Sequence, residues 1–308
     1  QLVLDNPPWC FQRGLTFSPN PGPGEYDIAL KESAYGNSLP PGEPEAWHDF
    51  IVALMNKLVD EYGQELVDTW RFRVHTEADF YPHHWAGTKM DYFEHYSNTA
   101  HAVRSVLPNA KLAAHFLEPT SGDRYGPEFV TWCSQNNVPY DFIGISYYPF
   151  YNIANRVDVD RLWNLNLKPF VDAPGWNTNA VLEIPEYSLF TEKDDDGYNM
   201  GVGTSHNPAF VAMLARMLYE KSIAHVHNWG DQYEDPIYLA LEGMLGKNRF
   251  ANQKTGSPTD SDNEIDGIFA TDGARESIDA MIFNYNPDPA YIADETVNLS
   301  LTVPFPAG

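Results

Sequence analysis

The stretch Trp70-Arg71-Phe72-Arg73-Val74-His75-Thr76-Glu77 decides how the rest of the chain is interpreted. Its first apolar residues alternate with arginines, which is the period-two pattern of a β-strand, and the strand breaks at a carboxylate. A segment rich in aromatic residues and histidines, Phe80 to Trp85, follows Glu77. A strand that ends in a glutamate and opens into an aromatic loop indicates a candidate active site.

Alternating strand and helix patterns surround this stretch. Apolar residues recur every three to four positions, as in amphipathic helices, over residues 44–62, 90–107, 127–135, 208–221 and 237–245. Strand patterns lie at residues 2–4, 111–116, 141–148, 180–183 and 224–229. Strands that alternate with helices at this spacing predict βαβ units and a parallel sheet.

The alternation predicts an α/β fold, a TIM (β/α)8 barrel. Strands near residues 2, 70, 112, 142, 181 and 225 give six of the eight that such a barrel needs. We therefore expect the first two βα units to precede Gln1, and we predict an N-terminally incomplete catalytic barrel over residues 1–250. Beyond this region the helical patterns stop, and strand patterns follow at residues 265–270, 277–285 and 296–303. Residues 251–308 are therefore predicted to begin an accessory β-sandwich.

The composition restricts the partners of the chain. Lys and Arg number 19 against 43 Asp and Glu, and the resulting formal charge of −24 repels nucleic acid and anionic membranes. No stretch approaches the roughly 18 apolar residues that a membrane helix needs. We therefore expect a secreted or periplasmic protein with neither nucleic acid nor membrane as partner. Aromatic residues make up 14%, and exposed aromatic faces are surfaces on which sugar rings stack.

Two glutamates follow predicted barrel strands, where catalytic groups of such barrels lie. Glu77 follows Val74-His75-Thr76, and Glu183 follows Val181-Leu182. Hydrolysis of a glycosidic bond needs a protonated carboxylic acid for the leaving oxygen and a second carboxylate that attacks the anomeric carbon or activates water. These two glutamates supply such a pair, unless each is only a solvated strand-end residue. Glu186, three positions further, is the alternative for the second role.

The stretch around Glu77 resembles clan A glycoside hydrolases, and most of all family 39, which holds β-xylosidases and α-L-iduronidases. The fourth strand of that family ends in Trp-Asn-Glu-Pro, whose Glu is the acid/base, and a Trp-containing loop and a helix that begins with a Tyr-Phe pair follow. Glu77, Trp85 and Tyr92-Phe93 stand at the matching positions. The resemblance covers most of the chain and implies that Glu77 is the acid/base.

The later strands carry weaker parts of the same resemblance. Residues 141–149 are similar to the sixth strand, which ends in His-x-Tyr-Pro, and residues 181–183 are similar to the seventh, which carries the nucleophile. The resemblance thus implies that Glu183 is the nucleophile of a retaining enzyme that cleaves a polysaccharide or oligosaccharide by double displacement. The residues that we expect to contact the carbohydrate substrate are Trp9, His75, Thr76, His115, Tyr147, Tyr148 and Trp229.

Three positions depart from the family pattern. Thr76 replaces the Asn that in the family binds the 2-hydroxyl of the sugar, Ala78 replaces the Pro, and Ser146 stands where the family has His. These changes indicate a substrate that differs from xylose near its 2-position, in a xylan-like or an algal galactan-like polymer. The alternative that they leave open is a non-catalytic carbohydrate-binding barrel.

No metal or other cofactor is predicted. The neighbouring His83 and His84 lack the i, i+4 partner of a zinc helix, and the acidic segments at residues 194–197 and 260–264 are interpreted as solvated turns rather than calcium loops.

Overall fold

A computed structural model of the chain describes residues 1–5, 7–8, 11, 37–117, 125–149, 162–194, 197–200, 206–229, 236–258, 263–274, 276–286 and 295–300. Structural statements below concern these residues. Trp9, a predicted sugar-stacking residue, lies outside them, as do parts of both acidic segments considered for calcium.

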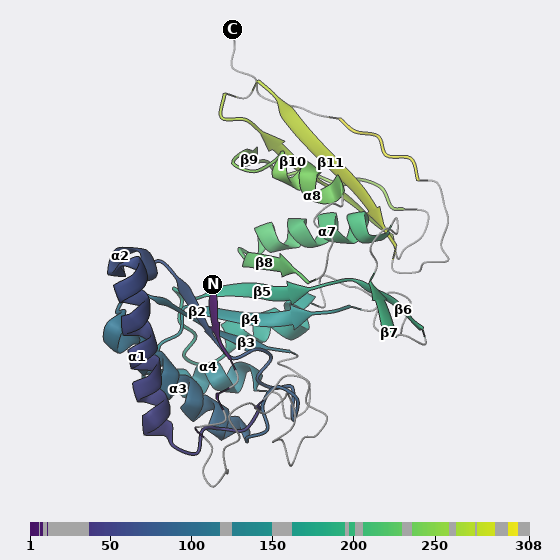
Figure 1. Ribbon diagram of the computed structural model, residues 1–308. Coiled ribbons are helices and arrows are strands. Elements are labelled where there is room, and N and C mark those ends of the chain that lie inside the picture. Colours follow the sequence, from purple (N-terminus) through teal and green to yellow (C-terminus); the bar gives the residue numbers. More distant parts are fainter. Residues whose placement is uncertain are drawn as a thin grey trace. The chain divides into compact units, whose positions relative to one another are not determined.

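A parallel sheet of six strands, in the order β1-β2-β3-β4-β5-β8, dominates the described part of the chain. Helices separate most of its strands in the sequence, and α1, α3 and α4 lie along one side of it (Figure 1). This is the arrangement of a partial TIM barrel, as predicted. The elements are β1 (Leu2–Leu4), α1 (Pro44–Tyr62), α2 (Gln64–Val67), β2 (Arg71–Val74), α3 (Lys89–Val106), β3 (Lys111–Phe116), α4 (Gly126–Asn136), β4 (Phe142–Tyr147), the π-helix η2 (Leu162–Leu167), α6 (Lys168–Asp172), β5 (Val181–Tyr187), β6 (Phe190–Asp194), β7 (Gly197–Met200), α7 (His206–Glu220), β8 (Ala224–Asn228), α8 (Pro236–Glu242), β9 (Asn248–Arg249), β10 (Glu264–Thr271) and β11 (Ile278–Tyr285).

The register of the sheet brings the carboxyl ends of its strands to one edge. Val74 at the end of β2 pairs with Leu4 at the end of β1 and with Ala114 in β3. Because parallel strands share a direction, residues that follow their last positions gather at the same edge, where catalytic groups of βα barrels lie.

β5 is longer than its sequence indicated, and this difference moves the strand end. The sequence pattern predicts a short strand over residues 180–183. In the structure β5 continues through Pro185 to Tyr187. Gly144 in β4 makes room for the proline ring, since a Cβ at this glycine would lie 2.5 Å from Cγ of Pro185.

The helices begin and end where their sequences direct. α1 has Pro44 at its first position, and Gly63, at a φ of 84°, follows its last turn. In α3, Thr88 and Asp91 form a reciprocal capping box. The indole N–H of Trp47 in α1 donates a buried hydrogen bond of 2.8 Å to Oγ1 of Thr99 in α3, so the two helices are joined by a specific polar contact.

An aromatic core lies between these helices and the sheet. It consists of side chains with little or no exposed surface, namely Phe72, Trp85, Tyr92, Phe93, Tyr96, Phe116 and Phe129. Tyr96 and Phe129 meet edge to face at 4.8 Å, the geometry that aromatic quadrupoles favour. This packing surrounds the end of β2 with rigid side chains.

The C-terminal part of the chain forms a small antiparallel sheet in the order β11-β10-β9. β10 and β11 pair from Glu264 with Tyr285 to Thr271 with Ile278, close to the predicted strands. The expected strand at residues 296–303 does not form over residues 296–300, and the remainder lies outside the described residues. The third strand is the two-residue β9, too short to show an alternating pattern in the sequence.

The described residues form two compact units that interleave along the chain. One comprises Gln1–Ser146, Arg161–Pro185 and Ala224–Val226, and the other comprises Tyr147–Asp160, Glu186–Ile223 and His227–Gly308. The predicted boundary between sequence domains at residue 250 stays a prediction.

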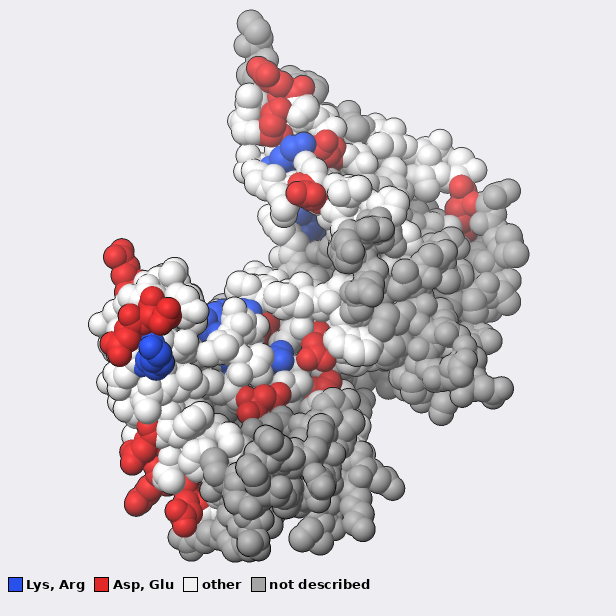
Figure 2. All heavy atoms as spheres, in the orientation of Figure 1, with Lys and Arg blue, Asp and Glu red and all other residues white. Residues whose placement is uncertain are grey.

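Acidic side chains gather over α1 and α2 on the face drawn in Figure 2, with few Lys or Arg among them. Among the described residues, no helix has the length and apolar character needed to cross a membrane.

Candidate active site

Glu77 lies in a strained turn directly after β2. His75 and Glu77 have φ values of 69° and 43°, in the left-handed region that costs a non-glycine residue about 1–3 kcal/mol. Backbone hydrogen bonds hold the turn: the N–H of His75 donates to the carbonyl of Leu4 at 3.1 Å, and the N–H of Ala78 donates to the carbonyl of His115 at 3.1 Å. Strain that neighbouring strands maintain is typical of functional sites.

The carboxylate of Glu77 is nearly enclosed, with 6% of the residue exposed. Its Oε2 lies 3.6 Å from Nδ1 of His84. That distance is too long for a hydrogen bond, yet the two groups interact electrostatically in a site with little water. The structure thus places Glu77 at the end of a barrel strand with a histidine beside it.

His75 is buried, although the sequence suggested that it contacts substrate. It has no exposed surface, its Nε2 donates to the carbonyl oxygen of His84 at 2.7 Å, and its Nδ1 lies 3.0 Å from Oδ1 of Asp5. The ring meets Trp85 edge to face at 5.2 Å. This burial argues against direct contact with a sugar and gives His75 a role in holding the turn.

His115 is enclosed in the same way. It has no exposed surface, and its Nε2 lies 2.9 Å from Oγ of Ser146. Burial, with a further contribution from the Arg73 guanidinium, holds the pKa of His115 well below its usual range, so the ring is neutral. The structure therefore disfavours direct substrate binding by His115 as well. Ser146, at the position of a histidine in the family pattern, is its hydrogen-bond partner.

Thr76 is the predicted substrate contact that stays partly accessible in the turn. Its Oγ1 accepts a hydrogen bond of 3.0 Å from Nη2 of Arg73. Because the guanidinium occupies an acceptor site, the hydroxyl hydrogen remains for donation to another group. The side chain is thus oriented by Arg73.

Glu183 is buried and ion-paired. It has no exposed surface, and its Oε2 lies 2.6 Å from Nη1 of Arg71. Burial raises the pKa of the carboxyl group and Arg71 opposes the rise, with a net upward shift. Nη2 of Arg71 donates in turn to the side chain of Gln1 at 2.8 Å. A carboxylate with no exposed surface is poorly placed to attack a sugar, which argues against the nucleophile role predicted for Glu183.

Glu186, the alternative for the second carboxylate role, is more accessible than Glu183. It is the sixth of seven residues in β5 and is partly exposed. The phenol of Tyr148 donates a hydrogen bond of 2.9 Å to its Oε2. Both Tyr147 and Tyr148 were expected to contact the carbohydrate, but Tyr147 is buried and packs at 6.2 Å from Phe210.

Trp229 lies beside this tyrosine, with the two rings edge to face at 6.0 Å. Half of Trp229, 51%, is exposed, and its backbone N–H donates to the carbonyl of Tyr187 at 2.8 Å. An exposed indole next to a carboxylate and a phenol offers the stacking face and polar groups that sugar binding uses.

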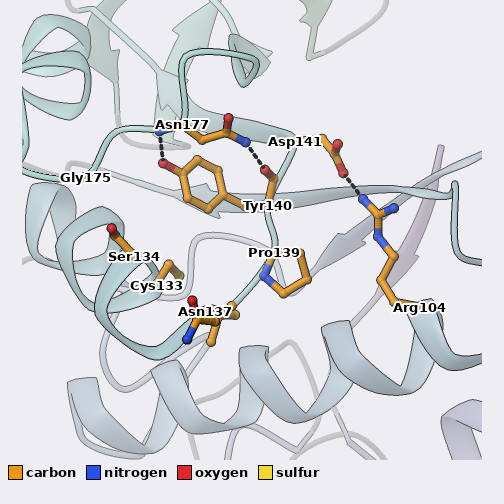
Figure 3. A pocket seen from close by; sticks show the side chains of 10 residues that line it. Arg104, Cys133, Ser134, Asn137, Pro139, Tyr140, Asp141, Gly175 and Asn177 are labelled. Carbon is orange, nitrogen blue, oxygen red and sulfur yellow. Dashed lines mark hydrogen bonds and ion pairs between the residues drawn. The ribbon is translucent and has the colours of Figure 1, made fainter.

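A cavity of about 310 Å³ opens at the other end of the strands, around the start of β4 (Figure 3). The backbone N–H of Asn177 donates to the phenol oxygen of Tyr140 at 2.8 Å, and Nη2 of Arg104 donates to Asp141 at 2.7 Å. These pairs tie the start of β4 to its neighbours. The amino ends of barrel strands serve stability rather than catalysis, so we assign this cavity no catalytic role.

Among the described residues, no cluster of three or more His, Cys, Asp and Glu side chains has the arrangement of a metal site. No sequence pattern indicates the contacts of Asp5 and Arg71, because each depends on a partner about 70 or more positions away.

Buried histidines make a testable contribution to acid sensitivity. Burial lowers the pKa of His95, between the rings of Trp47 and Trp85, from 6.5 to about 3. Below pH 6.5 the unfolded chain protonates this histidine while the folded protein does not, so stability is lost as the pH falls toward 3. His95→Phe is expected to reduce the drop in unfolding free energy between pH 7.5 and 5 by about 2 kcal/mol, measured by urea denaturation.

The control for this prediction is His101→Phe on the exposed side of the same helix, which is expected to leave the drop unchanged. A drop in His95→Phe equal to that of the unmodified protein would contradict the burial argument.

A parallel βα sheet with strand-end glutamates beside aromatic side chains agrees with the clan A glycoside hydrolases that the sequence resembles. The profile of "Glycosyl hydrolases family 39" matches residues 27–174. Residues 27–174 thus match glycoside hydrolase family 39, which confirms the resemblance found in the sequence.

Two characterised relatives illustrate the similarity. The "Alpha-1,4-L-rhamnosidase" of Formosa agariphila is 34% identical over 311 residues, which cover 100% of this chain and 62% of the relative. The "Beta-xylosidase" of Caldicellulosiruptor saccharolyticus is 34% identical over 114 residues, which cover 37% of this chain and 23% of the relative. The chain therefore spans less than two thirds of the length of either protein.

Solved structures support the fold. A glucosidase from Croceicoccus marinus matches with a TM-score of 0.60 at 20% identity, over 81% of this chain and 55% of that one. A family 39 β-xylosidase from Caulobacter crescentus matches with a TM-score of 0.56 at 20% identity, over 78% of this chain and 54% of that one. These matches confirm the partial TIM barrel.

Proposed function

We propose that the protein is a retaining glycoside hydrolase in which Glu77 is the general acid/base. The observation that carries this proposal is the position of Glu77, a nearly enclosed carboxylate in a strained turn at the end of a barrel strand. Burial of a carboxylic acid favours its protonated form, which is the form that a general acid needs.

We assign the nucleophile to Glu186, the alternative that the sequence left open. A nucleophile must reach the anomeric carbon, and Glu186 is partly exposed whereas Glu183 has no exposed surface. Tyr148 donates to Glu186, which orients its carboxylate. Arg71 holds Glu183 in a buried ion pair, for which a structural role is sufficient.

The reaction then takes two displacements. In the first, Glu186 forms a bond to the anomeric carbon while the glycosidic C–O bond breaks and the carboxylic acid of Glu77 gives its proton to the leaving oxygen. In the second, Glu77 removes a proton from water, the water oxygen bonds to the anomeric carbon, and the bond to Glu186 breaks. The first step leaves Glu77 as the carboxylate that the second step needs as a base. The second step returns Glu77 to its acid form and frees the carboxylate of Glu186 for the next cycle.

We further propose that the substrate is an α-1,4-linked L-rhamnosyl oligosaccharide or polysaccharide. The rhamnosidase relative aligns along the whole chain, whereas the xylosidase aligns over about a third. The departure at Thr76 agrees with this choice: the 2-hydroxyl of L-rhamnose is axial and that of xylose is equatorial, so a donor built for one geometry does not suit the other. Trp229 offers the stacking face.

Aryl glycosides and product stereochemistry test the proposal. The purified protein is expected to release 4-nitrophenol from 4-nitrophenyl α-L-rhamnopyranoside and to act at least about tenfold less well on the β-D-xylopyranoside, since a mispaired polar group costs about 1–3 kcal/mol. ¹H NMR of early product is expected to show the retained anomer. Inversion would overturn the mechanism. Binding of oligosaccharides without any release would show the alternative function, a carbohydrate-binding barrel.

A further inference from the structure

Two histidines join the strand-end turn to the loop that follows it, and we name them the histidine clasp. The ring of His75 donates from Nε2 to the backbone carbonyl of His84 at 2.7 Å. The ring of His84 lies with Nδ1 2.9 Å from the backbone carbonyl of Thr76. The ring of His75 thus binds the backbone of His84, and the ring of His84 binds the backbone of Thr76, the neighbour of His75. Glu77 directly follows Thr76.

The partners of the clasp fix its tautomers. A carbonyl oxygen only accepts hydrogen bonds, so His84 carries a proton on Nδ1 and His75 carries one on Nε2. The same Nδ1–H of His84 lies 3.6 Å from Oε2 of Glu77. One N–H therefore anchors the backbone before Glu77, and the ring nitrogen that carries it lies beside the Glu77 carboxylate.

His84 is neutral while it does this. Burial lowers the pKa of His84, and the neighbouring rings of His75 and His83 lower it further, while the bond to Thr76 and the charge of Asp5 oppose the shift. A cationic ring at this distance would stabilise the carboxylate of Glu77 and weaken it as an acid, whereas a neutral N–H orients it with a smaller effect. Arg73 and Asp79 are the other charged groups that neighbour the turn, through Thr76 and Leu117.

The loop provides a matched comparison for His84. The rings of His83 and His84 both lie against Phe80, at 5.0 and 5.2 Å between centroids, so both contribute similar aromatic packing. The bond to Thr76 and the approach to Glu77 belong to His84.

We propose that His84 is a positioning residue for the acid/base, whose Nδ1–H fixes the carbonyl of Thr76 and thereby the orientation of Glu77. The inference rests on the proposed role of Glu77 and adds a residue to that site. A shift of about 1 Å in a catalytic group can cost a hundredfold in rate. The left-handed φ of Glu77 is a conformation that a non-glycine residue keeps only when its surroundings hold it there.

Two isosteric substitutions test this proposal. Asparagine places an amide N–H at the position of Nδ1, whereas glutamine places it at the position of Nε2. His84→Asn is expected to retain kcat/KM within about fivefold, and His84→Gln is expected to lose about 10- to 100-fold on a disaccharide with an unactivated leaving group, with KM within about twofold. His83→Gln is the control and is expected to change neither value.

The leaving group separates a positioning role from a loss of folding. For a 2,4-dinitrophenyl glycoside the first step needs no proton, so kcat/KM of His84→Gln is expected to stay within about threefold of the unmodified protein. The basic limb of its pH profile on the disaccharide is expected to shift, because that limb reports the ionisation of Glu77.

Three other results would overturn the proposal. Equal activity of His84→Asn and His84→Gln would show that the position of the N–H is irrelevant, and equal losses on both leaving groups, or failure of both variants to fold, would make His84 purely structural. The proposed function fails separately, if the unmodified protein hydrolyses no glycoside or if Glu77→Gln loses activity equally on both leaving groups.

Discussion

Glu77→Gln is expected to lower kcat/KM on an unactivated disaccharide by about 10²–10⁴-fold, the usual contribution of a general acid. Glutamine preserves the size and hydrogen-bonding reach of the side chain in this nearly enclosed site, but it has no proton to give. On a 2,4-dinitrophenyl glycoside kcat/KM is expected to remain near that of the unmodified protein, because dinitrophenolate leaves without protonation. Steady-state kinetics on the two substrates measure the difference.

Azide provides the second half of this test. With the activated substrate, kcat of Glu77→Gln is expected to fall, because the second step lacks its base. Azide is a strong nucleophile that needs no base, so it should restore kcat and give a glycosyl azide of retained configuration. The variant's fold is checked by its denaturation midpoint. A loss of kcat/KM that is the same on both leaving groups would argue against the acid role of Glu77.

Much of the barrel could be predicted from the sequence, because amphipathic periodicity is a local property. The strand at Arg71 and the helix that starts at Lys89 follow directly from their residue patterns, and the family motif identified Glu77. Short elements were not predicted in this way. β9 has two residues, and the antiparallel strands β6 and β7 show no clear alternation of apolar and polar residues.

The candidate site was predicted less completely, for physical reasons that specific residues illustrate. The local pattern at residues 180–183 predicts a strand that ends at Glu183, whereas Gly144 opposite Pro185 allows β5 to continue past Glu186. His75 looked available to substrate, because its ion pair with Asp5 and its packing on Trp85 depend on the three-dimensional fold. Burial and long-range pairing are decided by tertiary contacts, and single-sequence patterns do not contain them.

Glu186→Gly and Glu183→Gln are expected to fail in different ways, and this contrast decides which glutamate is the nucleophile. Removing the nucleophile should lower kcat on every substrate by on the order of 10⁴–10⁶, as in other covalent catalysts. Glu186→Gly is expected to keep its denaturation midpoint, because Glu186 is partly exposed. Azide should then attack the anomeric carbon from the vacated side and give a glycosyl azide of inverted configuration, identified by NMR.

Glu183→Gln should instead lose stability. The substitution leaves the guanidinium of Arg71 in a part-buried site without its counter-charge, and breaking a buried ion pair in this way costs about 3–5 kcal/mol. Its folded fraction is expected to hydrolyse the activated glycoside within about tenfold of the unmodified rate, without rescue by azide. The double variant Arg71→Met with Glu183→Leu should recover much of the unfolding free energy, because apolar replacements remove both charges together. A stable Glu183→Gln that is inactive, together with a Glu183→Gly that azide rescues with inversion, would return the nucleophile role to Glu183.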